Sequence, residues 1–544
     1  MADWFEKVTL GDLVDRAAGR FGDKEALCFE GRRWTFNQLQ QDINRAARGL
    51  LQLGIQPGEK VILWMPNRPE WVHILFALAK IGAVLVPINT RFRTSDLEYV
   101  VRQSDGTTLI TVDRSGPVDY LDMVRQVCPE IEYSDANDIH SETFPELKRV
   151  LILGESPYQG TTLWADVLRQ AEANPKEDLK RRQQQVDPDG ISSIMYTSGT
   201  SGFPKGVMQS HRIVRMVTDM GNRIGITEKD VLLIYLPLFH ALGLWQGPLM
   251  SMLTGARMVL TTLFDPPETL ELIEKERATR IFGFDTHYRD LMAHPDIETR
   301  DLSSLRACML AAGMASSEPI AREAQKLIGP TITGWGMTEC GIPLISFLDS
   351  TEDERCTGSG YPLPGFEFKV IDPETGETLP ALTTGELCVR GHGVMQGYYK
   401  KPDETAQAVN AQGWLHTGDA AVRDEDGNYR FLGRYKDMLK VGGENVDAAE
   451  VEAFLSGHPG IEQVQIIGVP DSRLSEVPCA CVVPNQGHEL SVADLDAYCR
   501  GKLASFKIPR YLMPVPEFPM TPSGKVQKFK LLEMALETLD LPAA

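Results

Sequence analysis

Between residues 197 and 206 the chain reads Thr197-Ser198-Gly199-Thr200-Ser201-Gly202-Phe203-Pro204-Lys205-Gly206. This stretch directly follows a short apolar run, residues 191–196, of the kind that forms a buried strand. Glycines and small hydroxyl side chains let backbone N–H groups approach phosphate oxygens closely, and Lys205 adds a positive charge. The stretch is not a Walker A loop, because that motif has glycine immediately before its lysine and this chain has Pro204 there. A strand that runs into such a loop predicts an α/β protein with a phosphate-binding site.

Helix-like and strand-like segments alternate on both sides of this loop. Before it we expect helices at 42–54 and 70–81 and strands at 60–65 and 83–88; after it, strands at 231–236, 256–261 and 279–284. Such alternation implies mostly parallel sheets whose strands are connected by crossover helices. The polar stretch 133–190, with its charged run at 176–185, is expected to be a solvated connection or an exposed helix.

The pattern changes after residue 345. Short strand-like runs at 366–371, 385–390 and 429–432 lie between turn signals and predict a small β-rich unit, which we expect to be a barrel. From Asp437 onward the pattern is again mixed α and β. We therefore expect a large N-terminal domain, residues 1–436, of stacked and mostly parallel α/β subdomains plus the small β-barrel. A small mobile α+β domain, residues 437–544, follows it.

Composition and charge exclude several classes of protein. Of 544 residues, 42% are hydrophobic and 24% charged, the balance of an ordinary soluble globular protein. The net charge of −20 argues against a nucleic-acid-binding surface, which needs a basic face. The N-terminal stretch is charged and amphipathic, unlike a signal peptide, and polar residues and a proline interrupt the longest apolar stretch, 71–88. The nine cysteines lack zinc-ligand spacing. These features predict a cytoplasmic protein with reduced thiols and no membrane-spanning segment.

Further motifs follow the phosphate loop in a fixed order. They are Gly334-Trp335-Gly336-Met337-Thr338-Glu339, His416-Thr417-Gly418-Asp419, Gly433-Arg434-Tyr435-Lys436-Asp437, Lys440-Val441-Gly442-Gly443-Glu444-Asn445-Val446 and Pro519-Met520-Thr521-Pro522-Ser523-Gly524-Lys525. Together with the loop they resemble the adenylate-forming superfamily, which comprises acyl-CoA synthetases, luciferases and peptide-synthetase adenylation domains. The resemblance covers nearly the whole chain and is to the acyl-CoA synthetase branch.

The resemblance implies an acid–thiol ligase that uses ATP and coenzyme A. A free carboxylate is a poor electrophile, whereas a mixed anhydride with AMP carries a good leaving group. The implied enzyme therefore converts a carboxylate and ATP to acyl-AMP and pyrophosphate, and then acyl-AMP and CoA to acyl-CoA and AMP.

The resemblance also implies roles for individual residues toward the nucleotide. Glu339, with Thr200, holds Mg²⁺; Thr338 contacts the α-phosphate; and Thr200 with Lys205 grips the β- and γ-phosphates. Trp335 stacks on adenine, and Asp419 accepts hydrogen bonds from the ribose hydroxyls. The family often has an amide side chain two positions before this aromatic, where this chain has Thr333. The implied nucleotide-binding residues are Thr197, Ser198, Gly199, Thr200, Ser201, Gly202, Lys205, Ala312, Gly313, Gly334, Trp335, Gly336, Asp419 and Arg434.

The remaining implied roles lie in the C-terminal domain. Lys525 bridges the carboxylate and the α-phosphate and neutralises charge as two anions approach each other. Asp437 is the hinge about which the C-terminal domain rotates between the two half-reactions. Rotation brings Gly442, Gly443 and Glu444 to the site, where the glycines leave room for the pantetheine arm of CoA.

The acid pocket is expected near the segment 236–243, which resembles the family's aromatic gate beside the carboxylate. His240 is the candidate gate, or else a core histidine; amino-acid-activating relatives usually have Asp at this position. Other candidate pocket residues are Trp245, Phe284, His287, Cys340 and Gly341. Since they are mostly apolar or aromatic and include no arginine, we expect a hydrophobic monocarboxylate, a medium-chain fatty acid or an alicyclic acid.

Two alternatives stay open. An aryl-acid or cinnamate-type CoA ligase would share every motif and differ only in pocket shape. An inactive nucleotide-binding paralogue would be expected to have lost Lys525 or Glu339, and both are present. The expected partners are a small carboxylic acid, ATP and CoA, with a second copy of the chain as a further candidate and a role in fatty acid metabolism.

Overall fold

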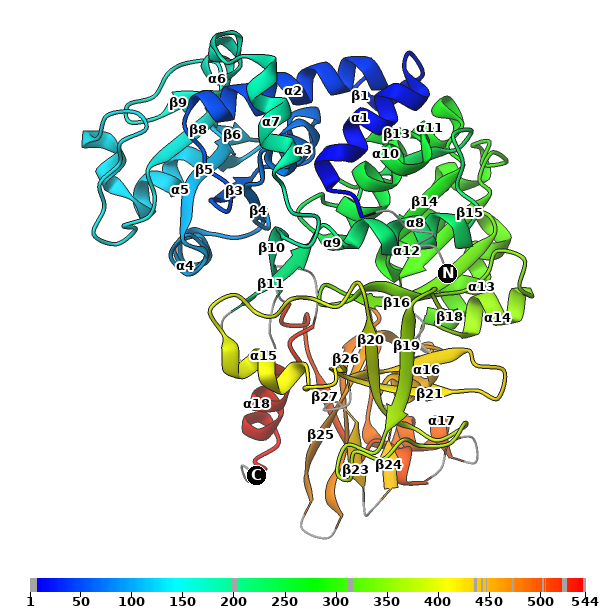
Figure 1. Ribbon diagram of the computed structural model, residues 1–544. Coiled ribbons are helices and arrows are strands. Elements are labelled where there is room, and N and C mark those ends of the chain that lie inside the picture. The colour runs from blue at the N-terminus through cyan, green and yellow to red at the C-terminus, as the bar shows by residue number, and fades with distance from the viewer. Residues whose placement is uncertain are drawn as a thin grey trace.

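The computed structural model describes residues 7–197, 204–311, 317–434, 438–441, 444–446, 448–471, 474–500, 503, 505–520 and 526–541. Two large sheets, mostly parallel, form the upper part of the molecule in Figure 1, and a four-stranded sheet and a C-terminal sheet lie below them. The predicted mixed α/β class with a separate C-terminal α/β unit is confirmed.

The first large sheet has nine strands in the order β18-β17-β16-β15-β14-β12-β13-β1-β2. Its inner neighbours, from β1 to β16, pair in parallel, whereas β2, β17 and β18 add antiparallel edges. The strands are β1 (Glu25–Phe29), β2 (Arg32–Thr35), β12 (Val231–Ile234), β13 (Arg257–Leu260), β14 (Arg280–Gly283), β15 (Ala307–Ala311), β16 (Thr331–Met337), β17 (Gly341–Ile345) and β18 (Tyr361–Pro362).

The second large sheet has seven strands in the order β11-β10-β4-β3-β5-β8-β9. All its neighbours pair in parallel except β10 and β11, which form an antiparallel hairpin at one edge. The strands are β3 (Lys60–Trp64), β4 (Val84–Pro87), β5 (Gly106–Val112), β8 (Arg149–Leu153), β9 (Thr162–Leu163), β10 (Ile191–Thr197) and β11 (Lys205–Ser210), and the small ribbon β6 (Arg114–Ser115) and β7 (Val118–Asp119) lies apart.

Crossover helices connect these strands, as the alternating pattern predicts. Every residue of α3 except Glu70 is buried, which explains why its sequence is apolar on all sides. The helices of this part are α1 (Leu10–Phe21), α2 (Phe36–Gln52), α3 (Pro69–Ile81), α4 (Thr94–Ser104), α5 (Tyr120–Val127), η1 (Pro129–Tyr133), α6 (Trp164–Gln170), η2 (Ala171–Ala173), α7 (Lys176–Gln184), α8 (Ile213–Arg223), α9 (Ala241–Leu244), η3 (Trp245–Leu249), α10 (Met250–Thr254), α11 (Pro266–Glu276), α12 (Asp285–Ala293), η4 (Pro295–Glu298), α13 (Glu318–Leu327), α14 (Glu352–Thr357) and α15 (Pro402–Ala408).

The expected β-rich unit is present, but it is not a barrel. It is an antiparallel sheet of β19 (Phe366–Ile371), β20 (Gly385–Gly391), β21 (Leu415–Arg423) and β22 (Tyr429–Arg434), in that order. In the part of the chain that the structure describes, the edge strands β19 and β22 do not pair with each other. Four strands are too few to close around a core, so the sheet stays open and packs on the rest of the N-terminal part.

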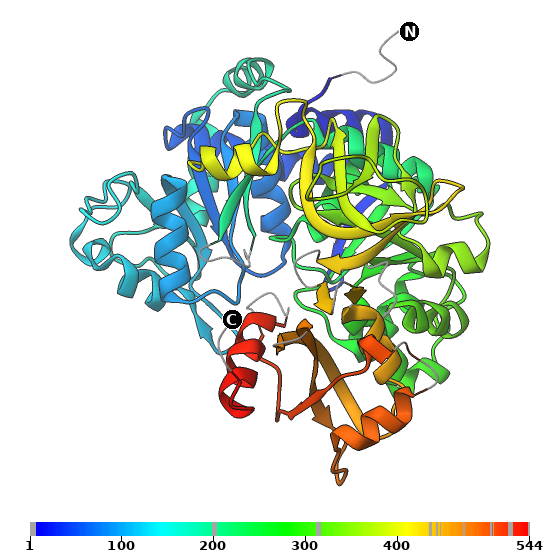
Figure 2. The same ribbon diagram turned by 90° about the horizontal axis from the view of Figure 1, so that it is seen from below.

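The C-terminal part has its own sheet and its own hydrophobic core. The sheet runs β24-β23-β26-β25, with β27 paired to β26. Its buried apolar side chains, from Leu439 to Ala535, form a cluster separate from the larger one that ends at Tyr429. Figure 2 shows this part, in orange and red, against one side of the N-terminal part. Its elements are β23 (Leu439–Val441), β24 (Glu444–Val446), α16 (Ala448–Leu455), β25 (Ile461–Asp471), β26 (Ser475–Pro484), α17 (Val492–Cys499), η7 (Ser505–Lys507), β27 (Tyr511–Pro514) and α18 (Lys528–Thr538).

None of the described helices combines the length and the apolar character that crossing a membrane requires. All nine cysteines are buried and free, as expected for core thiols.

Candidate active site

The described ends of the phosphate loop and the Trp335–Glu339 motif come together where the two large sheets meet. The β10–β11 hairpin ends at the pair Thr197 and Lys205, on either side of the phosphate loop. The turn from β16 to β17 carries Thr338 and Glu339. Gln209 on β11 joins the two sheets, because its side-chain amide donates to the backbone oxygen of Thr338 over 2.7 Å.

Residues 395–399 complete this junction. The chain there runs beside β11 and exchanges backbone hydrogen bonds with it: Met208 N to Gly397 O (3.0 Å), Gln396 N to Met208 O (2.9 Å) and Tyr399 N to Gly206 O (2.8 Å). Met395 N also donates to the backbone oxygen of Glu339 over 2.7 Å. This segment therefore fixes the phosphate hairpin and the Glu339 turn relative to each other.

Tyr398 is the side chain of this segment that reaches the candidate site. Its hydroxyl donates to Glu339 Oε1 over 2.9 Å, and the Lys205 ammonium lies 4.8 Å from the centre of its ring. One tyrosine thus contacts both the candidate metal ligand and the candidate phosphate-binding lysine. Tyr398 was not predicted as a site residue, because nothing in its local sequence marks it as one.

The surroundings of Glu339 fit a divalent cation. Only 6% of Glu339 is exposed. Among the described residues, no lysine, arginine or histidine forms an ion pair with its carboxylate. A buried carboxylate needs a compensating positive charge, and carboxylate oxygens are the ligands that Mg²⁺ prefers.

Trp335 and Asp419, the predicted adenine and ribose residues, contact each other directly. Trp335 Nε1 donates to Asp419 Oδ2 over 2.9 Å, and both residues are buried. The ring of Phe368 meets the Trp335 ring edge-on, with centroids 6.1 Å apart. This hydrogen bond fixes the rotation of the indole and the position of one Asp419 oxygen at the same time.

The glycines beside Trp335 are needed for packing. A Cβ on Gly336 would lie 2.2 Å from the backbone oxygen of Gly341, and one on Gly334 would lie 2.9 Å from that of Leu344. Both contacts are with backbone of β17 or its start, which cannot move aside. Thr333 also has a structural contact, since its hydroxyl can donate to the backbone oxygen of Arg355 or of Gly358, at 2.8 and 2.7 Å.

Asp419 stands at the end of a β-bulge in β21. Ala420 pairs with Glu386 and His416 pairs with Cys388, so residues 417–419 lie opposite Leu387 alone. Gly418 has φ of 67°, in the left-handed region that favours glycine. The Thr417 hydroxyl donates to Leu387 O over 2.6 Å and accepts from Asp419 N over 3.1 Å. The bulge turns the Asp419 carboxylate toward Trp335.

Three of the predicted acid-pocket residues form an aromatic cluster. The His240 and Phe284 rings meet edge-on at 6.1 Å, and the Phe284 and His287 rings are 5.8 Å apart. Tyr235 and Phe264, which the sequence analysis missed, extend the cluster at 5.4 Å and 4.7 Å from His287. Tyr235 directly follows β12 and Phe264 follows β13, and pocket residues are common at the carboxyl ends of parallel strands. We call these five residues the aromatic cluster.

The two histidines of the aromatic cluster differ in burial. Burial lowers the pKa of His287 to about 4, so its ring is neutral at pH 7, and its Nδ1 accepts from Phe284 N over 3.1 Å. His240 is exposed and caps α9, where its Nδ1 accepts from Leu242 N over 3.4 Å. Its exposed position at the cluster favours the gate over the core-histidine reading.

The other pocket candidates are more deeply buried. Trp245 begins the π-helical turn η3 and is only 2% exposed. Cys340 is fully buried, which raises the pKa of its thiol. Gly341 has φ of 83°, and a Cβ there would lie 2.7 Å from Met216 Cε. None of these three contacts the aromatic cluster through a ring or hydrogen bond among the described residues.

Several predicted site residues lie outside the described part of the chain. They are Ser198, Gly199, Thr200, Ser201, Gly202, Ala312, Gly313, Asp437, Gly442, Gly443 and Lys525, and the side chains of Arg434 and Glu444. Their roles stay predictions.

Comparison with known proteins agrees with this geometry. A family model described as AMP-binding enzyme matches residues 14–399, and one described as AMP-binding enzyme C-terminal domain matches residues 450–525. The putative acyl-CoA synthetase YngI of Bacillus subtilis is 37% identical over 542 residues, 98% of each chain. The mitochondrial medium-chain acyl-CoA ligase ACSF2 of Homo sapiens is 34% identical over 98% of this chain and 88% of its own length.

A solved structure is similar over the whole chain. The anthranilate CoA ligase AuaEII in complex with anthranoyl-AMP superposes with a TM-score of 0.86 at 28% identity, covering 99% of both chains. With the matched motifs, the shared fold and relatives of full length, the chain belongs to the AMP-binding enzymes, and among them it is an acyl-CoA synthetase, an AMP-forming acid–CoA ligase.

Proposed function

We propose that this acyl-CoA synthetase activates a hydrophobic monocarboxylate, a medium-chain fatty acid or an alicyclic acid. The observation that carries the proposal is the aromatic cluster. Phe284 and the neutral His287 offer an apolar wall to the acid, and His240 stands exposed beside them. The name of the ACSF2 relative, a medium-chain acyl-CoA ligase, supports the aliphatic reading.

Two observations favour other acids. Aromatic side chains stack well on aryl acids, and the structural neighbour AuaEII is an anthranilate CoA ligase, so an aryl acid is the second candidate. Arg91 is exposed and close enough to His287 for its charge to contribute to the lowered pKa of that ring. A cation at that position would suit a second carboxylate, which the sequence analysis did not anticipate.

The substrate is tested with a panel of acids in the presence of ATP and CoA. The panel holds aliphatic acids of graded length, alicyclic acids, benzoates, cinnamates, dicarboxylates and amino acids, and kcat/KM is measured for each from AMP release. We expect a medium-chain or alicyclic acid to have the highest kcat/KM. Highest turnover of a benzoate or cinnamate would favour the aryl alternative, and highest turnover of malonate or an amino acid would contradict the apolar pocket.

We propose that Glu339 holds Mg²⁺ together with Thr200. The bound cation would neutralise phosphate charge. In the described part of the site, the buried Glu339 carboxylate accepts from Tyr398 and can offer an oxygen to the cation, while Lys205 supplies a second positive charge. A cytoplasmic location and a role in fatty acid metabolism are proposed on the sequence alone.

Tyr398→Phe is expected to weaken divalent-cation binding about tenfold, because the Glu339 carboxylate loses the hydrogen bond that orients it. Mn²⁺ binding in the presence of ATP, followed by electron paramagnetic resonance, measures the effect directly. The neighbouring Tyr399→Phe is the matched control, since the Tyr399 hydroxyl donates to Asp105 Oδ2 over 2.8 Å instead. Unchanged Mn²⁺ affinity in Tyr398→Phe would show that this hydrogen bond does not act on the metal site.

A further inference from the structure

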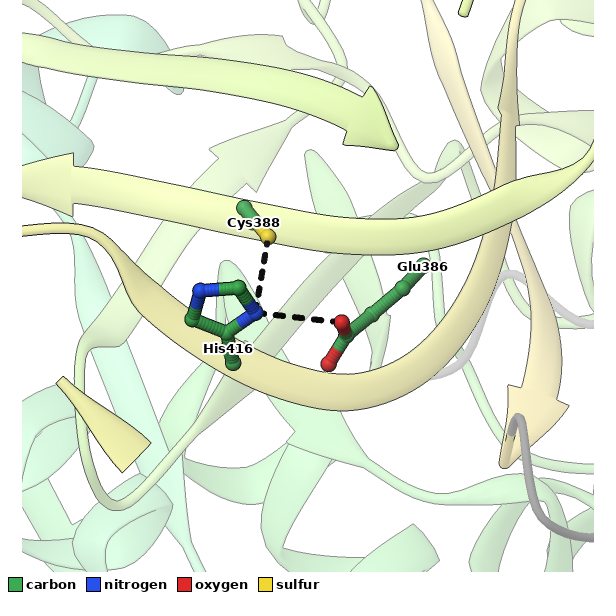
Figure 3. A group of neighbouring side chains, drawn as sticks. All are labelled: Glu386, Cys388 and His416. Carbon is green, nitrogen blue, oxygen red and sulfur yellow. Dashed lines mark hydrogen bonds and ion pairs between the residues drawn. The ribbon is translucent and has the colours of Figure 1, made fainter. Parts of the chain in front are cut away.

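Glu386, on β20, contacts the bulge that carries Asp419. Its Oε1 accepts from the backbone N–H of Gly418 over 3.0 Å. Its Oε2 lies 3.1 Å from His416 Nδ1, and Cys388 Sγ lies 3.7 Å from the same nitrogen. Figure 3 shows the three side chains converging from the two neighbouring strands.

The strand register explains why Glu386 is placed there. Cys388 and His416 are direct cross-strand partners, and Glu386 is two residues along the same strand, so the three side chains share one face of the sheet. Gly418 is one of the extra residues of the bulge, so the regular ladder does not supply a partner for its N–H. The Glu386 carboxylate supplies that partner, and a charged acceptor makes the hydrogen bond stronger than a neutral one would.

Two sets of contacts therefore hold the bulge. At its start, the Thr417 hydroxyl links Leu387 O and Asp419 N. At the middle, Glu386 holds the N–H of Gly418, the residue immediately before Asp419. His416 contacts the other carboxylate oxygen, so the Glu386 side chain has one preferred orientation.

Cys388, the third side chain beside Glu386 and His416, is uncharged. Burial raises the pKa of the Cys388 thiol to about 12, so the sulfur is protonated and packs beside the His416 ring. The same three side chains could also be considered as a site for a soft metal ion. Cysteine binds such an ion as a thiolate, whereas the Cys388 sulfur is protonated, so we do not interpret the group as a metal site.

We propose that Glu386, held by His416, is a positioning residue that fixes the ribose-binding bulge and so sets how tightly Asp419 grips the ribose of ATP. The proposal rests on the proposed role of Asp419 toward the ribose. Without Glu386 the Gly418 N–H loses its partner and the bulge can change its backbone angles. The Asp419 carboxylate is then in position to accept hydrogen bonds from both ribose hydroxyls only part of the time.

The test is discrimination between ATP and 2′-deoxy-ATP. For each variant, kcat and KM are measured with both nucleotides, together with the KM values for the acid and for CoA. The variants are Asp419→Asn, Glu386→Ala, Glu386→Gln and Glu386→Asp. Glu367→Ala is the matched control, because Glu367 is an exposed carboxylate on the neighbouring strand β19 that pairs with Arg390.

Glu386→Ala is expected to lower the preference for ATP over 2′-deoxy-ATP about tenfold, with the KM values for acid and CoA unchanged. Glu386→Gln should restore most of the preference, since its amide oxygen can still accept from Gly418 N. Glu386→Asp keeps the charge, but its side chain is one methylene shorter, so this variant should also show a lower preference for ATP over 2′-deoxy-ATP. It takes the place of Glu386→Ala in the test if the alanine variant does not fold. Glu367→Ala should match the parent.

Three results would overturn the inference. If Glu386→Ala and Glu386→Asp lower kcat/KM equally for ATP and 2′-deoxy-ATP, Glu386 contributes to the stability of the fold and not to ribose recognition. If both variants keep the parent preference while Asp419→Asn loses it, the ribose role of Asp419 stands and the positioning role of Glu386 is wrong. If Asp419→Asn itself keeps the preference, the proposed role of Asp419 fails, and the inference fails with it.

Discussion

Lys525→Ala is expected to reduce acyl-AMP formation about a thousandfold while leaving conversion of supplied acyl-AMP and CoA to acyl-CoA nearly unchanged. The reason is electrostatic: the acid carboxylate and the α-phosphate are both anions, and a lysine between them stabilises the charge that builds up as they join. No such charge pair forms when a thiol attacks the acyl-adenylate. Pyrophosphate release measures the first half-reaction, and thioester formation from added acyl-AMP measures the second.

The described residues that flank positions 521–525 are paired with each other, and α18 behind them offers a control for Lys525→Ala. Met520 pairs with Val526, and Gln527 N donates to Pro519 O over 2.8 Å, so the described residues on either side of positions 521–525 lie side by side. Lys530 is exposed on α18, and Lys530→Ala should keep both half-reactions. Equal loss of both half-reactions in a folded Lys525→Ala variant would contradict the assigned role.

Asp437→Pro is expected to have the opposite effect, keeping acyl-AMP formation and losing most thioester formation. Adenylation needs Lys525 at the α-phosphate, whereas thioester formation needs the same face open to a thiol, so one rigid arrangement cannot serve both. Proline fixes φ near −65° and would restrict rotation at this position. The two half-reaction assays used for Lys525→Ala also measure this variant.

The separation of the two hydrophobic cores supports a joint at this position. Among the described residues, Tyr429 is the last buried member of the N-terminal cluster and Leu439 the first of the C-terminal one, and position 437 lies between them. Asp437→Ala is the matched control, because it removes the carboxylate without fixing φ, and it should keep both half-reactions. Thioester formation at the parent rate in Asp437→Pro would rule out rotation about this residue.

Local patterns in the sequence predicted much of the α/β framework. The strand expected at 60–65 is β3 (Lys60–Trp64), and the helix expected at 70–81 is α3 (Pro69–Ile81). The helix expected at 42–54 begins earlier, at Phe36, because Thr35 and Gln38 form a capping box. That signal is visible in the sequence, but the apolar period alone does not reveal it.

The parts that the sequence did not predict depend on contacts between distant segments. Tyr398 reaches Glu339 only because residues 396–399 pair with β11, far away along the chain. Glu386 meets Gly418 through the register of β20 and β21, and no local motif announces that pairing. The nucleotide motifs could be identified because their residues are close together in sequence, whereas the residues that position them are not.

All five members of the aromatic cluster come from one continuous stretch, residues 235–287, and none of the nucleotide motifs falls inside it. If this cluster lines the acid pocket, as we propose, a single genetic exchange of that stretch with a relative is expected to change the acid preference and to leave the nucleotide motifs intact. Acid choice and adenylation chemistry would then be separable parts of one chain.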